Sequence, residues 1–414
     1  MRINLEINDI LSFALISNRK LISSFCLRLP YSICVKCKMR ATHIEISSSS
    51  LRIEWPRGLF NKVLTRIRQI FNKDLHLILD FEVLNALNYL NELKACTLCE
   101  WRCNVDRLRG ERGVCRVGIP EIAYTSFAYV LKSYSITFLG CCFRCIYCNA
   151  YRISQYPDAG WMYRGYSEPG NVAHELHLAL GTPIAKEIGT YRLSFTGGEP
   201  SIHTPYIEAV VDKAREVVPG IEVGIATNGF PTCRTLKRLM AIASYLNFEI
   251  KAFDDSIHET LTGANVEPVL RNAEYVATKN PEKVRVFRTV VVPGITDAQI
   301  PKIAEFIKDI DPVIPYRLIG FRPSFILYYH PGPSKHMMQR LVRTCRNIGL
   351  KNVDFSGYYP THTPVKTDDV GTDAAHVAAK YLKLAGCPTN PRNCGKCIFK
   401  DRCKATLMEP WIGK

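Results

Sequence analysis

The sequence has no long run of lysine and arginine and no recognisable nucleic-acid-binding module, although it is basic overall. Its 54 lysines and arginines outnumber 38 aspartates and glutamates, which gives a formal net charge of +16. An excess of this size suits phosphate binding. However, the basic residues are spread along the chain, and net charge alone says little about specificity. Nucleic-acid binding therefore stays one hypothesis among several.

A long apolar segment is also missing from the N-terminal region. Residues 5–17 are mildly apolar, but Glu6, Asn8 and Asp9 interrupt them, and the stretch is too short to span a bilayer. We therefore expect no secretory signal, no membrane association and a cytoplasmic location. With 47% hydrophobic and 22% charged residues, the composition is that of a globular protein and excludes a largely disordered chain.

Cysteine, in contrast, is abundant. The chain of 414 residues has 17 cysteines, and most of them are clustered, several as C-x2-C pairs. Such clusters in a long chain favour metal or iron–sulfur ligation in a reducing compartment over a framework of disulfides.

From about residue 134, short apolar segments alternate with amphipathic helical patterns. Strands are expected at 133–139, 191–196, 222–227, 247–253, 283–292, 316–321 and 352–357. Helices are expected to begin at Thr204, Thr296 and Ser334, which are good N-terminal capping residues. This alternation predicts an α/β fold with a parallel sheet, namely a partial (β/α)6 barrel, whose chemistry lies on loops at the C-terminal ends of the strands.

The chain divides into four predicted parts. Residues 1–95 form a basic extension without a clear strand–helix rhythm, in which 59–71 is a candidate amphipathic helix. Residues 96–130 form a cysteine-rich metal or cluster segment, and 131–365 form the barrel core. Residues 366–414 add a C-terminal helix and a further cysteine cluster.

The loop after the first barrel strand reads CCFRCIYC, residues 141–148. Cys142, Cys145 and Cys148 have the C-x2-C-x2-C spacing of a ferredoxin-type iron–sulfur loop. Cys141, Cys145 and Cys148 have C-x3-C-x2-C spacing, which can leave one iron of a cubane without a protein ligand. The first pattern indicates an electron carrier or a structural site, and the second indicates a catalyst. Spacing alone leaves both open.

Glycine and polar residues follow the next strands at the same predicted edge. The second strand is followed by Gly197, Gly198, Glu199 and Pro200. Glycines let a ligand approach the backbone closely, and a glutamate can accept a hydrogen bond from an ammonium group. Asn228 follows the third strand and Lys251 lies on the fourth, so all these segments are expected to face one cavity.

With these motifs the chain resembles the radical S-adenosylmethionine (SAM) superfamily. In that family a C-x3-C-x-aromatic-C loop binds a [4Fe-4S] cluster, and SAM chelates its open iron. Reduction then cleaves SAM to methionine and a 5′-deoxyadenosyl radical, which abstracts hydrogen from a substrate. The resemblance implies that Cys141, Cys145 and Cys148 are the catalytic ligands. Cys142, where relatives usually carry a non-ligand, leaves the alternative triad available.

The resemblance also implies the SAM contacts. Tyr147 is expected against the adenine, the segment from Gly197 through Gly198 and Glu199 to Pro200 around the SAM amino group, and Asn228 on the ribose side. Lys251 belongs to the same expected cofactor site. Within the superfamily, residues 149–155, 249–276, 286–297 and 316–324 are similar to the group around pyruvate formate-lyase activating enzyme.

Two further cysteine clusters flank the predicted barrel. Cys96, Cys99, Cys103 and Cys115 have C-x2-C-x3-C-x11-C spacing, which favours a closed four-thiolate site for zinc or an iron–sulfur cluster. Cys387, Cys394, Cys397 and Cys403 resemble part of the auxiliary-cluster ligand set of some radical SAM maturases. We expect an iron–sulfur cluster there in preference to zinc.

The resemblance implies a radical SAM enzyme whose substrate is a protein or peptide, as for activating enzymes and maturases, with ferredoxin or flavodoxin as electron donor. One alternative is radical SAM modification of tRNA or another nucleotide, which the basic charge would suit. Another is a non-catalytic iron–sulfur protein that binds nucleic acid. The intact Gly-Gly-Glu-Pro and Thr-Asn-Gly segments argue against that last alternative.

Overall fold

The computed structural model describes residues 88–155, 157, 164–327 and 330–359, together with the backbone of seven short strands before residue 80. These seven strands form two antiparallel sheets, ordered β5-β6-β1-β7 and β2-β3-β4. Their bounds are β1 (Arg2–Glu6), β2 (Ser12–Asn18), β3 (Leu21–Arg28), β4 (Ser32–Val35), β5 (His43–Ile46), β6 (Ser50–Glu54) and β7 (His76–Leu79). The sequence did not reveal them, because residues 1–95 show no clear alternation of strand and helix patterns.

The barrel core is built on one eight-stranded sheet, ordered β15-β14-β13-β12-β11-β10-β9-β8. The strands are β8 (Ile122–Ala128), β9 (Ser133–Phe138), β10 (Arg192–Gly197), β11 (Glu222–Thr227), β12 (Tyr245–Glu249), β13 (Val284–Val291), β14 (Tyr316–Gly320) and β15 (Val353–Ser356). Strands β9 to β15 run parallel, and β8 pairs antiparallel with β9. Within the described residues the sheet has two edges, so it is an open, partial barrel.

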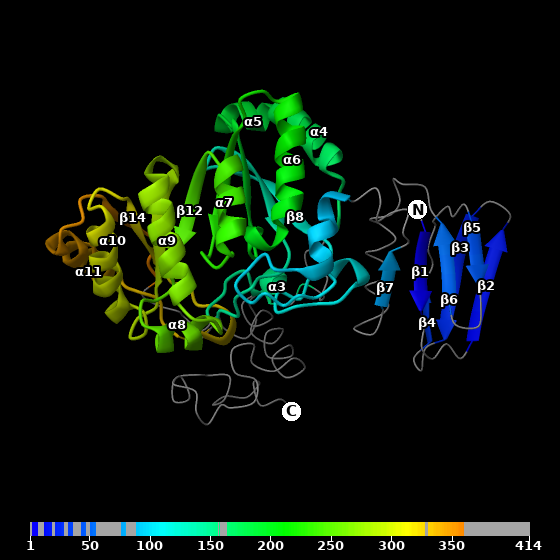
Figure 1. Cartoon of the computed structure of the whole chain (residues 1–414), viewed down its shortest axis with the longest axis horizontal. Coiled ribbons are helices and arrows are strands. Elements are labelled where there is room, and N and C mark those ends of the chain that lie inside the picture. The colour runs from blue at the N-terminus through cyan, green and yellow to red at the C-terminus, as the bar shows by residue number, and fades with distance from the viewer. Residues whose placement is uncertain are drawn as a thin grey trace.

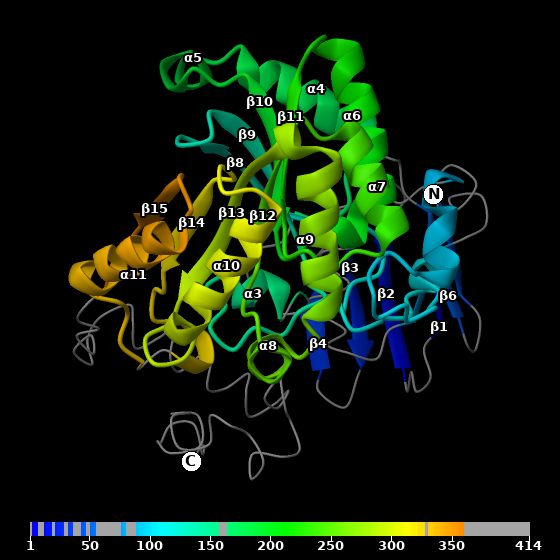
Figure 2. The ribbon, with the colours of Figure 1, turned by 60° about the vertical axis from the view of Figure 1, so that its left-hand side comes forward.

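Helices cover the outer face of this curved sheet (Figure 1 and Figure 2). The α-helices are α3 (Tyr151–Ser154), α4 (Pro169–Leu180), α5 (Pro183–Ile188), α6 (Thr204–Val217), α7 (Cys233–Ile242), α8 (Asp255–Thr262), α9 (Glu267–Lys279), α10 (Ile300–Ile310) and α11 (Lys335–Ile348). The 3-10 helices are η2 (Asn88–Ala95), η3 (Arg107–Arg109), η5 (Pro200–His203), η6 (Pro281–Lys283), η7 (Asp297–Gln299) and η8 (Phe325–Leu327). The short helices α3 and α8 lie at the lower edge of the sheet in Figure 1, where the parallel strands end.

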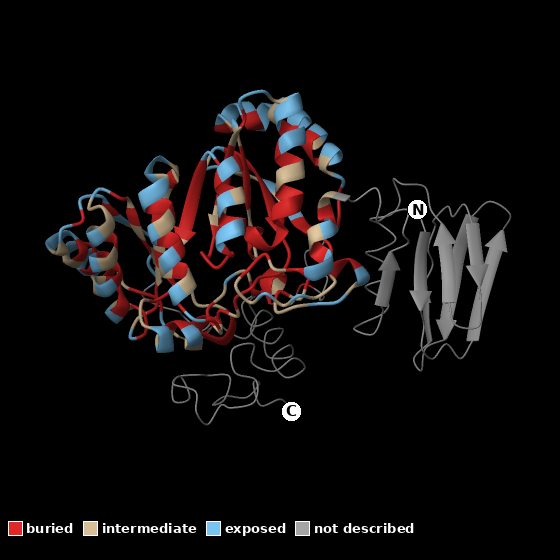
Figure 3. Ribbon diagram, in the orientation of Figure 1, coloured by how far each residue is buried: buried red, intermediate tan, exposed pale blue. Residues whose placement is uncertain are grey.

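The core fills the space between the sheet and these helices, and the buried residues concentrate on the strands (Figure 3). All six residues of β9 are buried, as expected for a parallel strand covered on both faces. The polar members of β9 satisfy one another across the sheet. Ser194 on β10 bonds to Ser133 at 2.8 Å and to Ser135 at 2.6 Å, so these hydroxyls can be buried without loss of hydrogen bonds.

The predicted α/β partial barrel is confirmed, with seven parallel strands where the sequence predicted six β/α units. The seven predicted strands correspond to β9 to β15. Ser334 caps α11, as expected, by accepting a hydrogen bond from Met337 N, whereas Thr204 is the first residue of α6 and His203 takes the capping position. Strand β8 was missed. The helix expected at 59–71 and the C-terminal part 366–414 lie outside the described residues.

Among the helices of the described residues, none is both long and apolar enough to cross a bilayer.

Candidate active site

A cavity of about 980 Å³ lies at the C-terminal edge of the parallel strands. This is the edge at which β/α sheets place their ligands, because the loops after successive strands meet there. The predicted site residues that line it are Cys141, Cys145, Cys148, Gly197, Gly198, Glu199, Asn228 and Lys251. The fold therefore brings together segments that follow β9, β10, β11 and β12.

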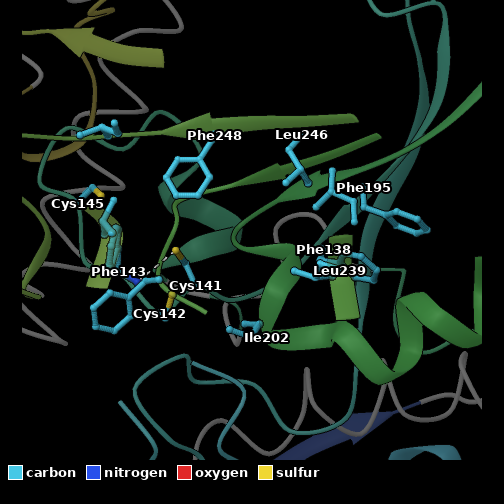
Figure 4. Close-up of a cluster of buried hydrophobic side chains, with 14 of the residues drawn as sticks. Phe138, Cys141, Cys142, Phe143, Cys145, Phe195, Ile202, Leu239, Leu246 and Phe248 are labelled. Carbon is cyan, nitrogen blue, oxygen red and sulfur yellow. Dashed lines mark hydrogen bonds between the residues drawn. The ribbon is translucent and has the colours of Figure 1, made fainter. Parts of the chain in front are cut away.

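The four cysteines of the loop differ in whether they line the cavity. Cys141, Cys145 and Cys148 line the cavity, whereas Cys142 is not among the lining residues. Cys142 is fully buried, and its Sγ accepts a hydrogen bond from Asn228 Nδ2 at 3.2 Å. Figure 4 shows Cys141, Cys142 and Cys145 in this buried surrounding. The three cysteines with C-x3-C-x2-C spacing thus share the cavity, and the choice between the two triads stays a prediction.

The loop is fixed by the end of α8. Arg144 N donates to Thr262 O at 2.6 Å, and Ile146 N donates to Leu261 O at 3.1 Å. These bonds hold the stretch between the cluster cysteines in place without using any thiol. A loop whose backbone is tied down in this way can present its cysteines in a fixed geometry.

Burial favours the protonated form of two of the cavity thiols. It raises the pKa of Cys148 to about 11, and it raises the pKa of Cys145 well above its usual range. Cys148 Sγ lies 3.2 Å from Ser154 Oγ. Because iron binds thiolates, cluster loading has to displace protons from these cysteines.

The Glu199 side chain accepts hydrogen bonds from two backbone N–H groups and one hydroxyl, which belong to two loops. Its Oε1 accepts from Ser201 N at 3.0 Å and from Thr227 Oγ1 at 2.8 Å, and its Oε2 accepts from Asn228 N at 2.8 Å. Burial raises the pKa of Glu199, while the three donors act in the opposite direction. The carboxylate therefore holds the loop after β10 against the loop after β11, a role that sequence reasoning did not identify.

The two glycines before Glu199 allow a close approach of two backbones. A Cβ on Gly198 would lie 1.7 Å from Gly140 O, and Gly197, with φ of +119°, would place one 2.4 Å from Phe138 N. Gly198 N donates to Phe138 O at 3.0 Å, and Glu199 N donates to Gly140 O at 2.9 Å. The glycines thus let this loop lie directly on the backbone that leads into the cysteine loop.

Three charged side chains that form ion pairs with one another line the cavity together with the cysteines. Glu249 pairs with Lys251 and with Arg288, whose Nη2 donates to Glu249 Oε1 at 2.8 Å. Burial alone would raise the pKa of Glu249, but the two cations bring it down to about 2. Burial alone would lower the pKa of Lys251. The negative charge of Glu249 outweighs the effect of burial, and the net shift of this pKa is upward. Both groups are therefore ionised at neutral pH.

Two residues predicted to contact SAM are not among those that line the cavity. The buried ring of Tyr147 lies edge-on to Phe321, with 6.4 Å between the ring centroids. Pro200 is buried as the first residue of η5. The contact of Tyr147 with adenine and the part of Pro200 in the cofactor site stay predictions, as does the contact of Asn228 with the ribose.

The cavity is also lined by three arginines that were not predicted from the sequence as site residues: Arg152, Arg288 and Arg322. Each of them lies inside a segment that resembles the activating-enzyme group, so the resemblance contained the signal. Their position on the cavity could not be read from the sequence, because arginine is common on ordinary protein surfaces.

The N-terminal cysteine cluster lies in the loop between η2 and β8. Cys96, Cys99 and Cys115 are buried, and Cys103 is half-buried. In the described part of the chain, no three His, Cys, Asp or Glu side chains have the geometry of a single bound metal ion. The C-terminal cluster of Cys387, Cys394, Cys397 and Cys403 lies outside the described residues. A metal at either of these two four-cysteine clusters therefore stays a prediction.

Comparison with protein families gives one match across the barrel. The model of the radical SAM superfamily matches residues 135–307, which include the cysteine loop, the Gly-Gly-Glu-Pro segment and Lys251. These residues form a radical SAM domain. The radical SAM family uses a [4Fe-4S] cluster and SAM, and the three thiols that share the cavity suit a cluster with three cysteine ligands.

Relatives of known name include activating enzymes. The chain is 27% identical over 239 residues to pyruvate formate-lyase 1-activating enzyme of Escherichia coli, an alignment that covers 52% of this chain and 88% of that protein. It is 30% identical over 140 residues to isethionate sulfite-lyase activating enzyme of Desulfovibrio desulfuricans, covering 33% and 44%. This second alignment spans less than half of that relative.

An uncharacterised protein of Methanocaldococcus jannaschii is 25% identical over 287 residues, which cover 67% of this chain and 80% of that protein. A solved domain of pyruvate-formate lyase-activating enzyme from Bacteroides vulgatus is 21% identical, with a TM-score of 0.33, and the match covers 40% of this chain and 98% of that domain.

Proposed function

We propose that this chain is a radical SAM enzyme of the activating-enzyme or maturase type, which abstracts hydrogen from a protein or peptide. The observation that carries the proposal is which of the four neighbouring cysteines line the cavity. Cys141, Cys145 and Cys148 line one cavity with Lys251, while Cys142 does not. The relatives named as activating enzymes support the protein or peptide substrate.

The residues of this chain have separate tasks in that reaction. Cys141, Cys145 and Cys148 would hold the [4Fe-4S] cluster. Bound there together with SAM, such a cluster would supply the radical chemistry that removes hydrogen from the substrate. Glu199 holds the two loops that border the cavity, and the ion pair of Lys251 and Glu249 places fixed charges beside it. Burial of the cysteine loop excludes water from these groups.

A nucleotide or tRNA substrate is the second candidate, because cations outnumber carboxylates along the cavity. The cations Lys251, Arg152, Arg288 and Arg322 line it, together with the two carboxylates of Glu199 and Glu249. Arginine recognises phosphate well, through paired hydrogen bonds. Ferredoxin or flavodoxin is the proposed electron donor for either substrate.

The test is formation of 5′-deoxyadenosine by the full-length protein, reconstituted anaerobically and supplied with SAM and dithionite. Two matched variants, Cys145→Ala and Cys142→Ala, separate the alternative cysteine triads. We expect activity in the wild type and in Cys142→Ala, and none in Cys145→Ala. Loss of activity in Cys142→Ala, with cluster content reduced as far as in Cys145→Ala, would overturn the assigned triad.

The substrate class needs a second measurement on the same protein. Peptide pools, nucleoside triphosphates and bulk tRNA are added separately, and 5′-deoxyadenosine formation is compared with the rate without substrate. Stimulation by peptides alone supports the proposal, and stimulation by nucleotides or tRNA alone supports the second candidate. RNA binding that weakens with salt, without SAM cleavage under any condition, would contradict both and favour a non-catalytic cluster protein.

A further inference from the structure

Arg107 is a buried cation that forms no ion pair with an aspartate or glutamate among the described residues. It is 1% exposed and follows Asp106 at the start of η3. Its Nε donates to Gly118 O at 2.8 Å, and its Nη1 donates to Ile202 O at 2.6 Å and to Cys96 Sγ at 3.6 Å. All three acceptors are neutral when the thiol is protonated. Among the described residues, Nη2 of Arg107 has no hydrogen-bond partner.

Cysteines of the N-terminal cluster lie near this guanidinium. Besides Cys96, the thiols of Cys99 and Cys115 are close enough for their charge to act on Arg107. The fourth cysteine, Cys103, lies against Gly113, where an added Cβ would come within 2.8 Å of its Sγ. Gly113 precedes Cys115 by two residues, so the missing side chain lets Cys103 lie beside this part of the segment.

A buried arginine cannot relieve its charge by losing a proton, because its pKa is too high. An uncompensated buried charge strongly destabilises a fold. Neutral thiols do not compensate it, but thiolates do. Buried thiols become thiolates when a metal takes the place of their protons, and four thiolates around Zn²⁺ or around a [4Fe-4S]²⁺ cluster carry a net negative charge.

The segment also lies directly behind the radical SAM cysteine loop. Trp101 Nε1 donates to Cys142 O at 2.8 Å, which joins the segment to the loop. A Cβ added to Gly140 would lie only 2.8 Å from Cys115 O, so the backbone before Cys141 packs closely against the segment. Cys142, which does not line the cavity, is therefore a cysteine through which the loop contacts the segment.

We propose that Cys96, Cys99, Cys103 and Cys115 hold a metal centre with thiolate ligands behind the radical SAM loop, and that Arg107 compensates its negative charge. Arg107 is a positioning residue, because it reaches the metal through its ligands. The proposal is independent of the substrate and of SAM cleavage. Zinc and an iron–sulfur cluster share this thiolate chemistry, and the metal analysis distinguishes them.

The first experiment counts metal in full-length protein purified anaerobically. Iron and zinc per chain are compared between the wild type, a Cys96→Ala/Cys115→Ala variant and a variant with Cys141, Cys145 and Cys148 all changed to Ala. We expect the first variant to lose about one zinc or about four irons and to keep the metal of the radical SAM loop. The second variant should keep the metal that the first one loses. Equal metal content in the wild type and in a folded Cys96→Ala/Cys115→Ala variant would overturn the proposal.

The unmutated protein gives a second readout if that variant does not fold. The half-buried Cys103 and the exposed, isolated Cys233 are compared for alkylation by iodoacetamide, followed by peptide mass spectrometry. Cys103 should react only after a chelator has removed the metal, whereas Cys233 should react at once. Immediate alkylation of both cysteines would contradict a metal-bound Cys103.

The role of Arg107 is tested with Arg107→Gln, Arg107→Lys and Arg109→Gln. The Arg109 side chain is 77% exposed and serves as the matched control. We expect Arg107→Gln to release metal to a chelator about tenfold faster, in line with other residues that support metal ligands. Arg107→Lys keeps the charge and should restore most of the retention, and Arg109→Gln should behave as the wild type. Unchanged release from Arg107→Gln would refute the charge compensation.

Discussion

Glu199 offers a direct test of what holds the candidate site together. The carboxylate accepts hydrogen bonds from Ser201 N, Thr227 Oγ1 and Asn228 N, and it is 1% exposed. If these bonds fix the loops after β10 and β11, substitution of Glu199 should lower stability even when no SAM is present. If Glu199 only contacts SAM, the protein without SAM should be indifferent to the change.

The size of the effect follows from the groups left behind. Glu199→Ala deprives two buried backbone N–H groups, those of Ser201 and Asn228, of their acceptor. Each unsatisfied buried donor costs roughly 1–3 kcal/mol, so the free energy of unfolding should fall by about 4 kcal/mol. Glu199→Gln keeps the volume and one acceptor oxygen but turns an amide N–H₂ toward a donor, and a loss of about 2 kcal/mol is expected.

The assay is urea unfolding of metal-free protein at pH 7, followed by far-UV circular dichroism and tryptophan fluorescence. Glu216→Gln is the control, because its side chain is 59% exposed and pairs only with Lys213 on the surface of α6. Its effect should stay within about 0.5 kcal/mol. The reasoning is refuted if Glu199→Gln also falls within that margin. Weaker SAM binding with unchanged stability would assign Glu199 to SAM alone.

Two further predictions concern buried groups near the site. Burial lowers the pKa of His203 to about 3 and that of His258 to about 4, so below pH 6.5 protons bind mainly to the unfolded chain. Stability should therefore be lost as pH falls, by about 2 kcal/mol for each histidine between pH 7 and pH 5, and His203→Gln should remove about half of this dependence in urea unfolding. Gly198→Ala, whose Cβ would lie 1.7 Å from a carbonyl oxygen, should cost more than about 3 kcal/mol or abolish soluble expression. Gly170→Ala on α4, with open space around the added Cβ, should stay within about 1 kcal/mol of the wild type, and equal melting temperatures for both glycine variants would contradict this contrast.

The parallel strands could be predicted because they are buried on both faces and read as continuous apolar segments. Strand β8 has the sequence Ile-Ala-Tyr-Thr-Ser-Phe-Ala, and its residues alternate between buried and partly exposed only in part. It is an antiparallel edge strand, and such a mixed segment resembles a loop in sequence. The cysteines before it also suggested a separate segment, although β8 belongs to the main sheet.

The meeting of Cys141, Cys145 and Cys148 at one cavity could be predicted, because their spacing is a local property of the chain. The partners of Glu199 could not, since Thr227 and Asn228 are almost thirty residues away, and only the neighbouring ends of β10 and β11 bring them together. Arg107 was hidden for a different reason. In the sequence it is one of 54 basic residues, and only burial beside thiols distinguishes it.

The pairing of the cysteine-rich segment with the loop after β11 has a consequence for synthesis. Thr232 N donates to Leu98 O, and the two residues are 134 positions apart. At 5–20 residues per second, the ribosome needs roughly 7–27 s to make the intervening chain. Until then Cys96 and Cys99 have emerged without the backbone that later positions them. The first cysteines of the candidate metal centre to be translated thus gain this backbone partner only after β8 to β11 have been made, and a metal held by all four cysteines would be loaded after that point.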